Sequence, residues 1–549
     1  MANAYSTGFQ QSKNFPKPDN SRSMRSTGLT PYTGQWTNTE VVHLLKRTMF
    51  GAAKADVDYF LTKTMSQAVD ELLTPSASAP VGPLNNYNDA NYTDPNVALG
   101  AEWGNAPYDT NVNTKRKKSF KSWWIGQMLN QGRSIEEKMT LFWHNHFATQ
   151  ISTIGDARMA YKNNVLLRSN ALGNFKTFTK AVTKDPGMLR YLNGYLNTKN
   201  APDENYAREL QELFTVGKDP VQQYTQSDVQ QAAKVLTGYR VDAANNICTF
   251  DSTKHDITNK QFSSFYNNTV ITGQSGAAGE NELDDLLTML FATNEVAEFI
   301  CKKIYRFFVY YNIDAATDTN VIQPMAVIFR NSNYDITPVL SALFKSEHFY
   351  DALNRGCIIK SPADYFVGAC REFNAVFPAS TDLVQQYYFW YVLETVMASC
   401  TQDIGDPPNV AGWQAYYQAP GYHEMWINSD TLPKRTQYFD LLVNTGYTHQ
   451  GFTLKFDVLA FTASLSNPQD PNVVINESLA LIYSIDTDTN LFNYLKSILL
   501  SGQATDNYWT SAWIDYVNAP TNQTYVGIVK SRLSQMFQYL IDLAEYQLS

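Results

Sequence analysis

The sequence lacks the long apolar run that a membrane-spanning helix requires. Such a helix takes about 20 mostly apolar residues, whereas the longest candidate, Tyr387 to Met397, is short and contains Glu394. The amino-terminal region has no hydrophobic signal core, and Arg22 and Arg25 do not form a twin-arginine pair. We therefore expect a soluble, cytoplasmic protein. Export in association with a signal-bearing partner is the alternative.

An excess of positive charge is also missing. The chain has 43 Lys and Arg against 52 Asp and Glu, a net charge of −9. Proteins that bind nucleic acid without regard to sequence need a basic surface. This balance argues against that class of function.

The short motifs that would indicate several common chemistries are absent. The five cysteines are widely spaced with no CxxC pair, which argues against a disulfide framework or a thiolate zinc site. No GxSxG elbow occurs. The glycine-rich stretch Gly273 to Gly279 lacks the P-loop lysine and leads into carboxylates, so we interpret it as a turn.

What the sequence does contain is helical periodicity over most of its 549 residues. It predicts a mainly α protein: a large multi-helix bundle with long irregular loops and little or no β-sheet. We expect a flexible N-terminal arm over residues 1–36 and a helical core over 37–445. A C-terminal helical subdomain over 446–549 is expected to pack on that core.

Helix start and stop signals set several boundaries. Thr37 with Glu40, Ser134 with Glu137, and Thr225 with Asp228 each have the spacing of a capping box. Residues 75–113 are predicted to be a long loop. The basic run 115–118 is expected near the start of the helix that follows, just outside it or paired with acidic side chains.

The stretch from residue 202 to 241 is predicted to form two helices around a polar loop, the first from about 204 to 216 and closed by Gly217. Polar side chains gather on one side of this first helix, opposite its apolar side. Ion pairs at i,i+4 would explain them without chemistry, and a polar site is the alternative. These side chains belong to Asn205, Arg208, Glu209 and Glu212.

Three further groups are candidates for function. His144 and His146 are two residues apart, so a regular helix cannot aim both at one metal ion, and core histidines are the alternative. His255 and Asp256 on a loop make an acid–base pair. The segment from Asp406 to Trp413 is rigid and aromatic, which suits a ligand wall or a structural corner.

Several strings together resemble one bacterial family, known as domain of unknown function 1800. They span about Thr37 to Ser549 in order. The strings are LLKRTMFGA, EKMTLFWHNHFAT, ENYARELQELFTVG with YTQSDVQQAAKVLTGYRV, FDSTKHD, KIYRFFV, KSPADYFVGACREF, DPPNVAGW, WINSDTLPKR and EYQL.

The resemblance implies a large helical bacterial protein without a settled activity. Members of this family are often encoded beside proteins of domain of unknown function 1501, which look like sulfatases or alkaline phosphatases. Some relatives carry His where this chain has Phe214, which puts in doubt any metal scheme that needs that position.

Two hypotheses follow. In the first, the protein is a hydrolase or transferase acting on an envelope- or glycan-derived substrate. Its catalytic residues would be Arg208, Glu209, His255 and Asp256; its ligand-binding residues Asn205, Glu212, Asp406 and Trp413; and a divalent metal would be held by His144 and His146. In the second, it is a non-catalytic scaffold for the sulfatase- or phosphatase-like partner.

Overall fold

A computed structural model describes residues 28–89, 91–218, 221–483, 485 and 487–549. The chain is mainly α, as predicted, and the strands of the described residues form three two-stranded antiparallel hairpins. Along the described ranges, none of the helices combines the length and apolarity that crossing a bilayer demands.

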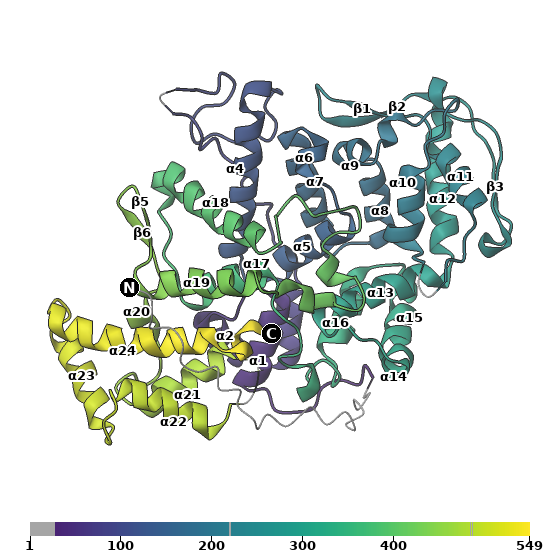
Figure 1. The fold of residues 1–549 in the computed structure, drawn as a ribbon. Coiled ribbons are helices and arrows are strands. Elements are labelled where there is room, and N and C mark those ends of the chain that lie inside the picture. The colour runs from purple at the N-terminus through teal and green to yellow at the C-terminus, as the bar shows by residue number, and fades with distance from the viewer. Residues whose placement is uncertain (1–27, 90, 219–220, 484, 486) are drawn as a thin grey trace.

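The amino-terminal part of the fold is a succession of helices (Figure 1). They are α1 (Asn38–Thr48), α2 (Lys54–Leu61), α3 (Met65–Leu72), α4 (Thr110–Leu129), α5 (Glu136–His146), α6 (Ile151–Ile154), α7 (Ala157–Ser169), α8 (Phe175–Thr183), α9 (Pro186–Tyr191), α10 (Asn205–Glu209) and α11 (Gln226–Val235).

Two hairpins follow, and helices then resume. The elements are β1 (Tyr239–Asp242), β2 (Ile247–Phe250), β3 (Lys260–Gln261), β4 (Val270–Ile271), α12 (Glu282–Phe291), α13 (Asn294–Phe308), α14 (Ala315–Thr317), α15 (Gln323–Asn331), α16 (Ile336–Phe344), α17 (Pro362–Glu372) and α18 (Leu383–Ser399).

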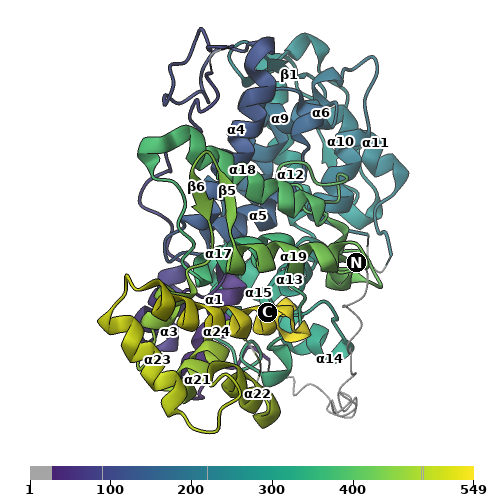
Figure 2. The same cartoon turned by 60° about the vertical axis from the view of Figure 1, so that its left-hand side comes forward.

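The remaining chain contains the third hairpin between helices. It comprises α19 (Thr431–Asn444), β5 (Tyr447–His449), β6 (Phe452–Leu454), α20 (Val458–Ala463), α21 (Pro471–Ile482), α22 (Thr489–Leu499), α23 (Asn507–Asn518) and α24 (Gln523–Asp542). The last of these, α24, returns to pack against α19 and α20. The helices α21 to α24 gather at one end of the molecule, opposite α8 to α12 (Figures 1 and 2).

Helix α5 lies near the centre of the molecule in both views (Figures 1 and 2). Every residue from Glu137 to His146 is buried. The ring of Trp143 packs on Phe147, Phe175 and Phe178, and its indole nitrogen donates to a backbone carbonyl at 3.0 Å. A helix buried on all sides carries its polar residues into the interior, where each needs a partner.

Helices α4 and α18 pack closely along one another. The approach depends on Gly126 of α4, because a Cβ there would lie 2.7 Å from the ring of Trp390 on α18. The contact holds α4 and α18 close together. Lys121 of α4 and Glu394 of α18 lie on these two helices.

The predicted boundary signals were confirmed at several positions. The backbone nitrogen of Thr37 donates to Glu40 at 3.1 Å, and that of Thr225 donates to Asp228 at 2.7 Å. Gly217 takes the left-handed conformation, with φ 80°, that ends the helix before it.

Other local predictions were confirmed only in part or were wrong. The basic run 115–118 lies inside α4 rather than outside it, but it pairs with acidic side chains, as the alternative expected: Arg116 binds the buried Asp94 at 2.8 Å, and Lys115 lies 3.4 Å from Asp89. Glu137 does not complete a capping box, because both its oxygens bind Arg168, at 2.6 and 3.0 Å.

Residues 1–27 of the predicted arm, which spans residues 1–36, fall outside the described residues. From residue 28 onward it is described, and Tyr32 there donates its backbone nitrogen to the carbonyl of Lys345 at 2.8 Å.

Candidate functional site

Three carboxylates surround one lysine where α4 meets α18. The Lys121 ammonium lies 3.5 Å from Oε1 of Glu394 and 3.1 Å from Oδ2 of Asp406, and it also bonds to Asp403. Three acidic groups around one base leave an excess of negative charge. We call these four residues the carboxylate cluster.

The loop after α18 delivers the two aspartates. Gly405 turns the chain with φ 87°, and its carbonyl accepts from the backbone nitrogen of Ile151 at 2.9 Å. Ser152 then donates to Asp406 Oδ1 from its backbone nitrogen at 2.9 Å and from its hydroxyl at 2.6 Å. Because one oxygen of Asp406 faces Ser152 and the other faces Lys121, its carboxylate is fixed in orientation.

Within the cluster, Glu394 titrates far from its usual range. Burial and the adjacent Asp403 raise the pKa of Glu394 to about 8, against the opposing effect of Lys121. Burial lowers the pKa of Lys121, but the three carboxylates more than offset this and hold it above its ordinary value. Near neutral pH, Glu394 therefore carries a proton while Lys121 stays charged.

An open cleft of about 510 Å³ adjoins the cluster. Asp403 and Asp406 line it, with side chains 41% and 18% exposed, while Glu394 lies just behind them at 3%. Trp413 and Trp426 also line the cleft, and because each is at most 2% exposed they form its buried backing. Paired carboxyl groups beside a cleft are the groups that cleave glycosidic bonds.

The wall of the cleft is anchored to the central helix α5. The backbone nitrogen of Trp413 donates to Asn145 Oδ1 at 2.8 Å, and the amide of Gln150 donates to the carbonyl of Pro407 at 2.8 Å. Gly412 lies against Asn145 with φ 91°, and a Cβ there would come within 2.2 Å of Asn145 Oδ1 and 2.4 Å of its backbone oxygen.

Replacing Gly412 with Ala is therefore expected to destabilise the protein by about 3 kcal/mol, from left-handed strain and overpacking together. Chemical denaturation of both proteins measures the difference. Gly451→Ala is the control: its φ is 83° but no atom lies within 4 Å of the added Cβ, so only about 1 kcal/mol of strain is expected. Equal costs for the two variants would contradict the close seat of Gly412 on α5.

His144 lies behind the cleft, between two indoles. Its ring is 5.1 Å from that of Trp124 and 5.7 Å from that of Trp413. Burial lowers the pKa of His144 to about 4, with Asp406 opposing and Lys121 adding to the effect. Its Nε2 is buried and has no hydrogen-bond partner in the described part of the chain. The ring is thus neutral and supports the position of Trp413.

Glu209 is a half-buried carboxylate that acts electrostatically on Tyr191. Burial raises the pKa of Tyr191 to about 12, and both Glu209 and Asp406 add to the shift, so the phenol lies within electrostatic range of each. Burial, followed by Glu212, raises the pKa of Glu209 to about 6. Of the predicted residues, the structure brings together His144, Asp406 and Trp413.

His146 faces a different part of the core. Its Nε2 lies 3.1 Å from the carbonyl of Phe214, and its Nδ1 accepts from Lys303 at 3.0 Å. That carbonyl belongs to a π-helical turn, Leu210–Thr215, which continues α10 in place of the predicted regular helix. Both ring nitrogens of His146 are thus in use within the protein.

The predicted metal pair gains no support from this arrangement. His144 and His146 point to different neighbours, and among the residues that the structure describes no three His, Cys, Asp or Glu side chains are placed to hold a metal ion.

The other polar residues of the 202–241 stretch have local partners. Arg208 bonds to Glu204 and to Gln226, each at 2.9 Å, and Glu212 pairs with Lys218. Asn205 donates to the carbonyl of residue 192 at 3.2 Å. The Glu204–Arg208 pair matches the i,i+4 interpretation of this surface, whereas Glu212 pairs with a lysine six residues farther on.

His255 is enclosed in a buried network. Its Nε2 lies 3.0 Å from Glu282 Oε1, while the other oxygen of Glu282 pairs with Lys260 at 2.5 Å. The His255 side chain is 1% exposed, and Asp256 uses one oxygen to hold the backbone nitrogen of Thr258 at 2.8 Å. These residues join the loop to α12, away from the carboxylate cluster.

Sequence reasoning did not identify Lys121, Glu394 or Asp403 as site residues. A signal was present for one of them, because Glu394 is the only charged residue within an apolar stretch from 387 to 397. A lone carboxylate on a buried helix needs a partner or a proton.

Comparison with known proteins shows the family. The model of the family described as "Protein of unknown function (DUF1800)" matches residues 43–548, nearly the whole chain, so the protein belongs to that family. No curated protein and no solved structure matches it.

Proposed function

We propose that the protein is a hydrolase or transferase that acts by acid–base catalysis on a glycan-derived substrate in the cleft beside the carboxylate cluster. The observation that carries the proposal is the pairing of a carboxyl that is protonated near neutral pH, Glu394, with the Asp406 carboxylate on the same lysine. Paired carboxyl groups whose environments separate their proton affinities are typical of acid–base sites.

The geometry suits cleavage of a glycosidic bond. The distance between Glu394 Oε1 and Asp406 Oδ2 cannot exceed the sum of their distances to the lysine, 3.5 and 3.1 Å. That limit admits the spacing of about 5 to 5.5 Å between the carboxyl groups of retaining glycosidases.

Each residue then has a role. The substrate occupies the cleft, which Trp413 and Trp426 back from the interior. The proton of Glu394 reaches the leaving oxygen through Asp403, which touches Glu394 and opens into the cleft. Asp406, held by Ser152, faces the sugar carbon or activates water or an acceptor hydroxyl.

Hydrolysis of bacterial envelope polysaccharides, measured as release of reducing ends, tests the proposal. Asp406→Asn is expected to lower the rate about 100-fold or more, because the amide cannot act as nucleophile or base. The control is Asp430→Asn, whose carboxylate is 67% exposed and pairs with Lys434 outside the cleft; it is expected to leave the rate unchanged.

If the wild-type protein releases no reducing ends from any polysaccharide, or if both variants behave alike, the catalytic proposal fails. The scaffold hypothesis would then be favoured by co-purification of a sulfatase- or phosphatase-like partner with the unmodified chain. The loop 75–113 does not specifically favour that alternative, since Trp103 within it is fully buried and bonds to Ser119 at 2.9 Å.

A further inference from the structure

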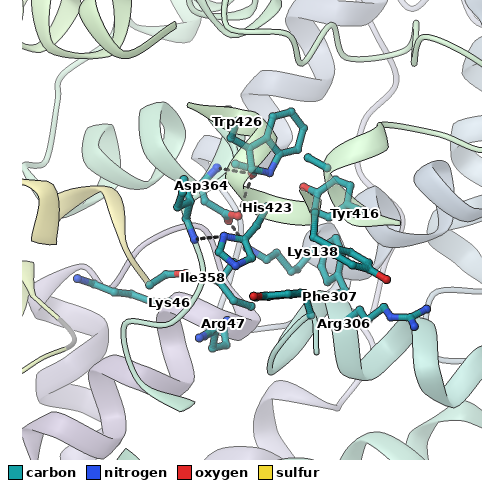
Figure 3. Close-up of a pocket in the computed structure, with 16 residues that line it drawn as sticks. Lys46, Arg47, Lys138, Arg306, Phe307, Ile358, Asp364, Tyr416, His423 and Trp426 are labelled. Atoms are coloured by element: carbon teal, nitrogen blue, oxygen red, sulfur yellow. Dashed lines mark hydrogen bonds and ion pairs between the residues drawn. The ribbon is translucent and has the colours of Figure 1, made fainter. Parts of the chain in front are cut away.

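A small enclosed cavity lies on the other side of the segment that forms the cleft wall. Its volume is about 30 Å³, more than the roughly 10–15 Å³ that one water molecule requires. Ala415 and Trp426 line both the cavity and the cleft. Figure 3 shows its lining, which comes from α1, α5, α13, α17 and the segment 415–426.

Positive charge predominates around this cavity. Its charged side chains are Lys46, Arg47, Lys138, Arg306 and a single carboxylate, Asp364. Lys138 reaches Asp364 and forms an ion pair (Figure 3). Lys46 turns its amino group away, toward Glu372 at 3.8 Å. Arg47 and Arg306 are left without a carboxylate partner among the described residues.

Arg47 is buried, with 3% of its surface exposed. Its Nη2 donates to the carbonyl of Asn354 at 2.9 Å and to the sulfur of Cys357 at 3.3 Å. Along the described chain, its Nε and Nη1 have no hydrogen-bond acceptor. A buried guanidinium with two free donor positions is an incomplete site.

His423 adds a second unused donor. Its Nδ1 accepts from the backbone nitrogen of Ile359 at 3.1 Å, so in the neutral ring the hydrogen lies on Nε2. Burial, together with the charge of Arg47, lowers the pKa of His423 to about 4. The buried Nε2 has no partner in the described residues.

Arg306 stands at the edge of the cavity. Its guanidinium lies 5.6 Å from the ring centre of Tyr422, and both residues also line a surface cleft of about 610 Å³. Arg306 and Tyr422 thus form a wall that the cavity shares with that cleft.

We propose that this cavity binds a small oxyanion, the carboxylate, phosphate or sulfate group of a ligand, between Arg47 and the Nε2–H of His423, with Arg306 at its entrance. Buried positive charge without a counter-ion is costly. The forked donors of a guanidinium match the oxygens of such a group. The site is separate from the carboxylate cluster and does not depend on the proposed catalysis.

Two further buried cations next to the cavity also favour the binding of an anion. Burial, together with nearby Lys46, lowers the pKa of Lys360 to about 7. Arg435 is fully buried and uses Gln547 and a backbone carbonyl as acceptors, with no carboxylate partner in the described ranges. Ser549 also lines the cavity. A bound anion would offset this charge.

Thermal unfolding of the full chain in phosphate, sulfate, acetate and chloride at equal ionic strength tests the proposal. The three oxyanions are expected to raise the unfolding midpoint in a saturable way, beyond chloride. Arg47→Met is expected to weaken the binding of at least one of these oxyanions by about tenfold or more. The variant should not lower the unfolding midpoint in chloride, because it removes an uncompensated buried charge.

Arg306→Met, at a partly exposed position, is a second variant that should also weaken binding should Arg47→Met fail to fold. The control is Arg133→Met, whose side chain is 37% exposed and pairs with Asp56 away from the cavity; it should keep the full oxyanion response. The proposal is overturned if chloride stabilises as much as the oxyanions, or if the oxyanion response survives in both cavity variants.

Discussion

Replacing Glu394 with Gln is expected to lower the rate of polysaccharide cleavage by about 10²- to 10⁴-fold. The amide keeps the shape of the side chain but has no proton to give to the leaving group. Because Glu394 lies behind Asp403 and Asp406 rather than in the open cleft, substrate binding should change much less than turnover. Steady-state kinetics, with kcat and KM measured separately, distinguish the two effects.

The same assignment predicts the direction in which activity changes with pH. The pKa of Glu394 is raised to about 8, so the proton donor is present below that pH and is lost above it. Wild-type activity should therefore fall as the pH rises through about 8, and the residual activity of Glu394→Gln should lack that descending limb. A descending limb that persists in the variant would assign the proton to another group.

The second large effect concerns stability. Glu282→Gln is expected to lower the free energy of unfolding by about 3 kcal/mol or more, because it leaves the Lys260 ammonium buried without its counter-ion. Both side chains are fully buried, and the next carboxylate, Asp256, lies 3.9 Å from Lys260. Urea denaturation followed by circular dichroism measures the loss.

Glu280→Gln is the matched control for that experiment. Glu280 lies two residues before α12 and pairs with Lys184, and both side chains are more than a third exposed. Its removal is expected to cost about 0 to 1 kcal/mol. A similar small cost for Glu282→Gln would mean that the network around His255 does not hold the loop in place, and would reopen a chemical role for His255.

The helical class and several helix boundaries followed from the sequence because they depend on local signals. The capping pairs at Thr37 and Thr225 and the left-handed Gly217 act within a few residues of chain. The π-helical turn at Leu210–Thr215 did not follow. Its carbonyl at Phe214 meets His146, and Lys303 bonds both that ring and the carbonyl at residue 213, a contact between distant segments.

The candidate site was predictable only in part for the same reason. Asp406 and Trp413 were identified because proline and tryptophan mark a rigid aromatic loop. Lys121 and Glu394 were not, because their roles arise only when α4 and α18 pack at the distance that Gly126 allows. Polar patterning suggested function for Arg208 and Glu212, which the fold instead supplies with local partners.

The cavity on the far side of the wall was missed entirely. Its cations lie in LLKRTMFGA, EKMTLFWHNHFAT and KIYRFFV, which are far apart along the chain, and the sequence assigned no role to any of these cations. In the sequence, each of these cations by itself has the pattern of a charge on a helix surface. Their burial becomes evident only after α1, α5 and α13 come together.

The protonation state of Glu394 near neutral pH is the measurement that tests this account most directly. Infrared difference spectra between the wild-type protein and Glu394→Gln, both with ¹³C-labelled glutamate, isolate the carboxyl band of this one residue. The account predicts a protonated carboxyl at pH 7 that ionises near pH 8. A carboxylate band already complete at pH 6 would contradict it.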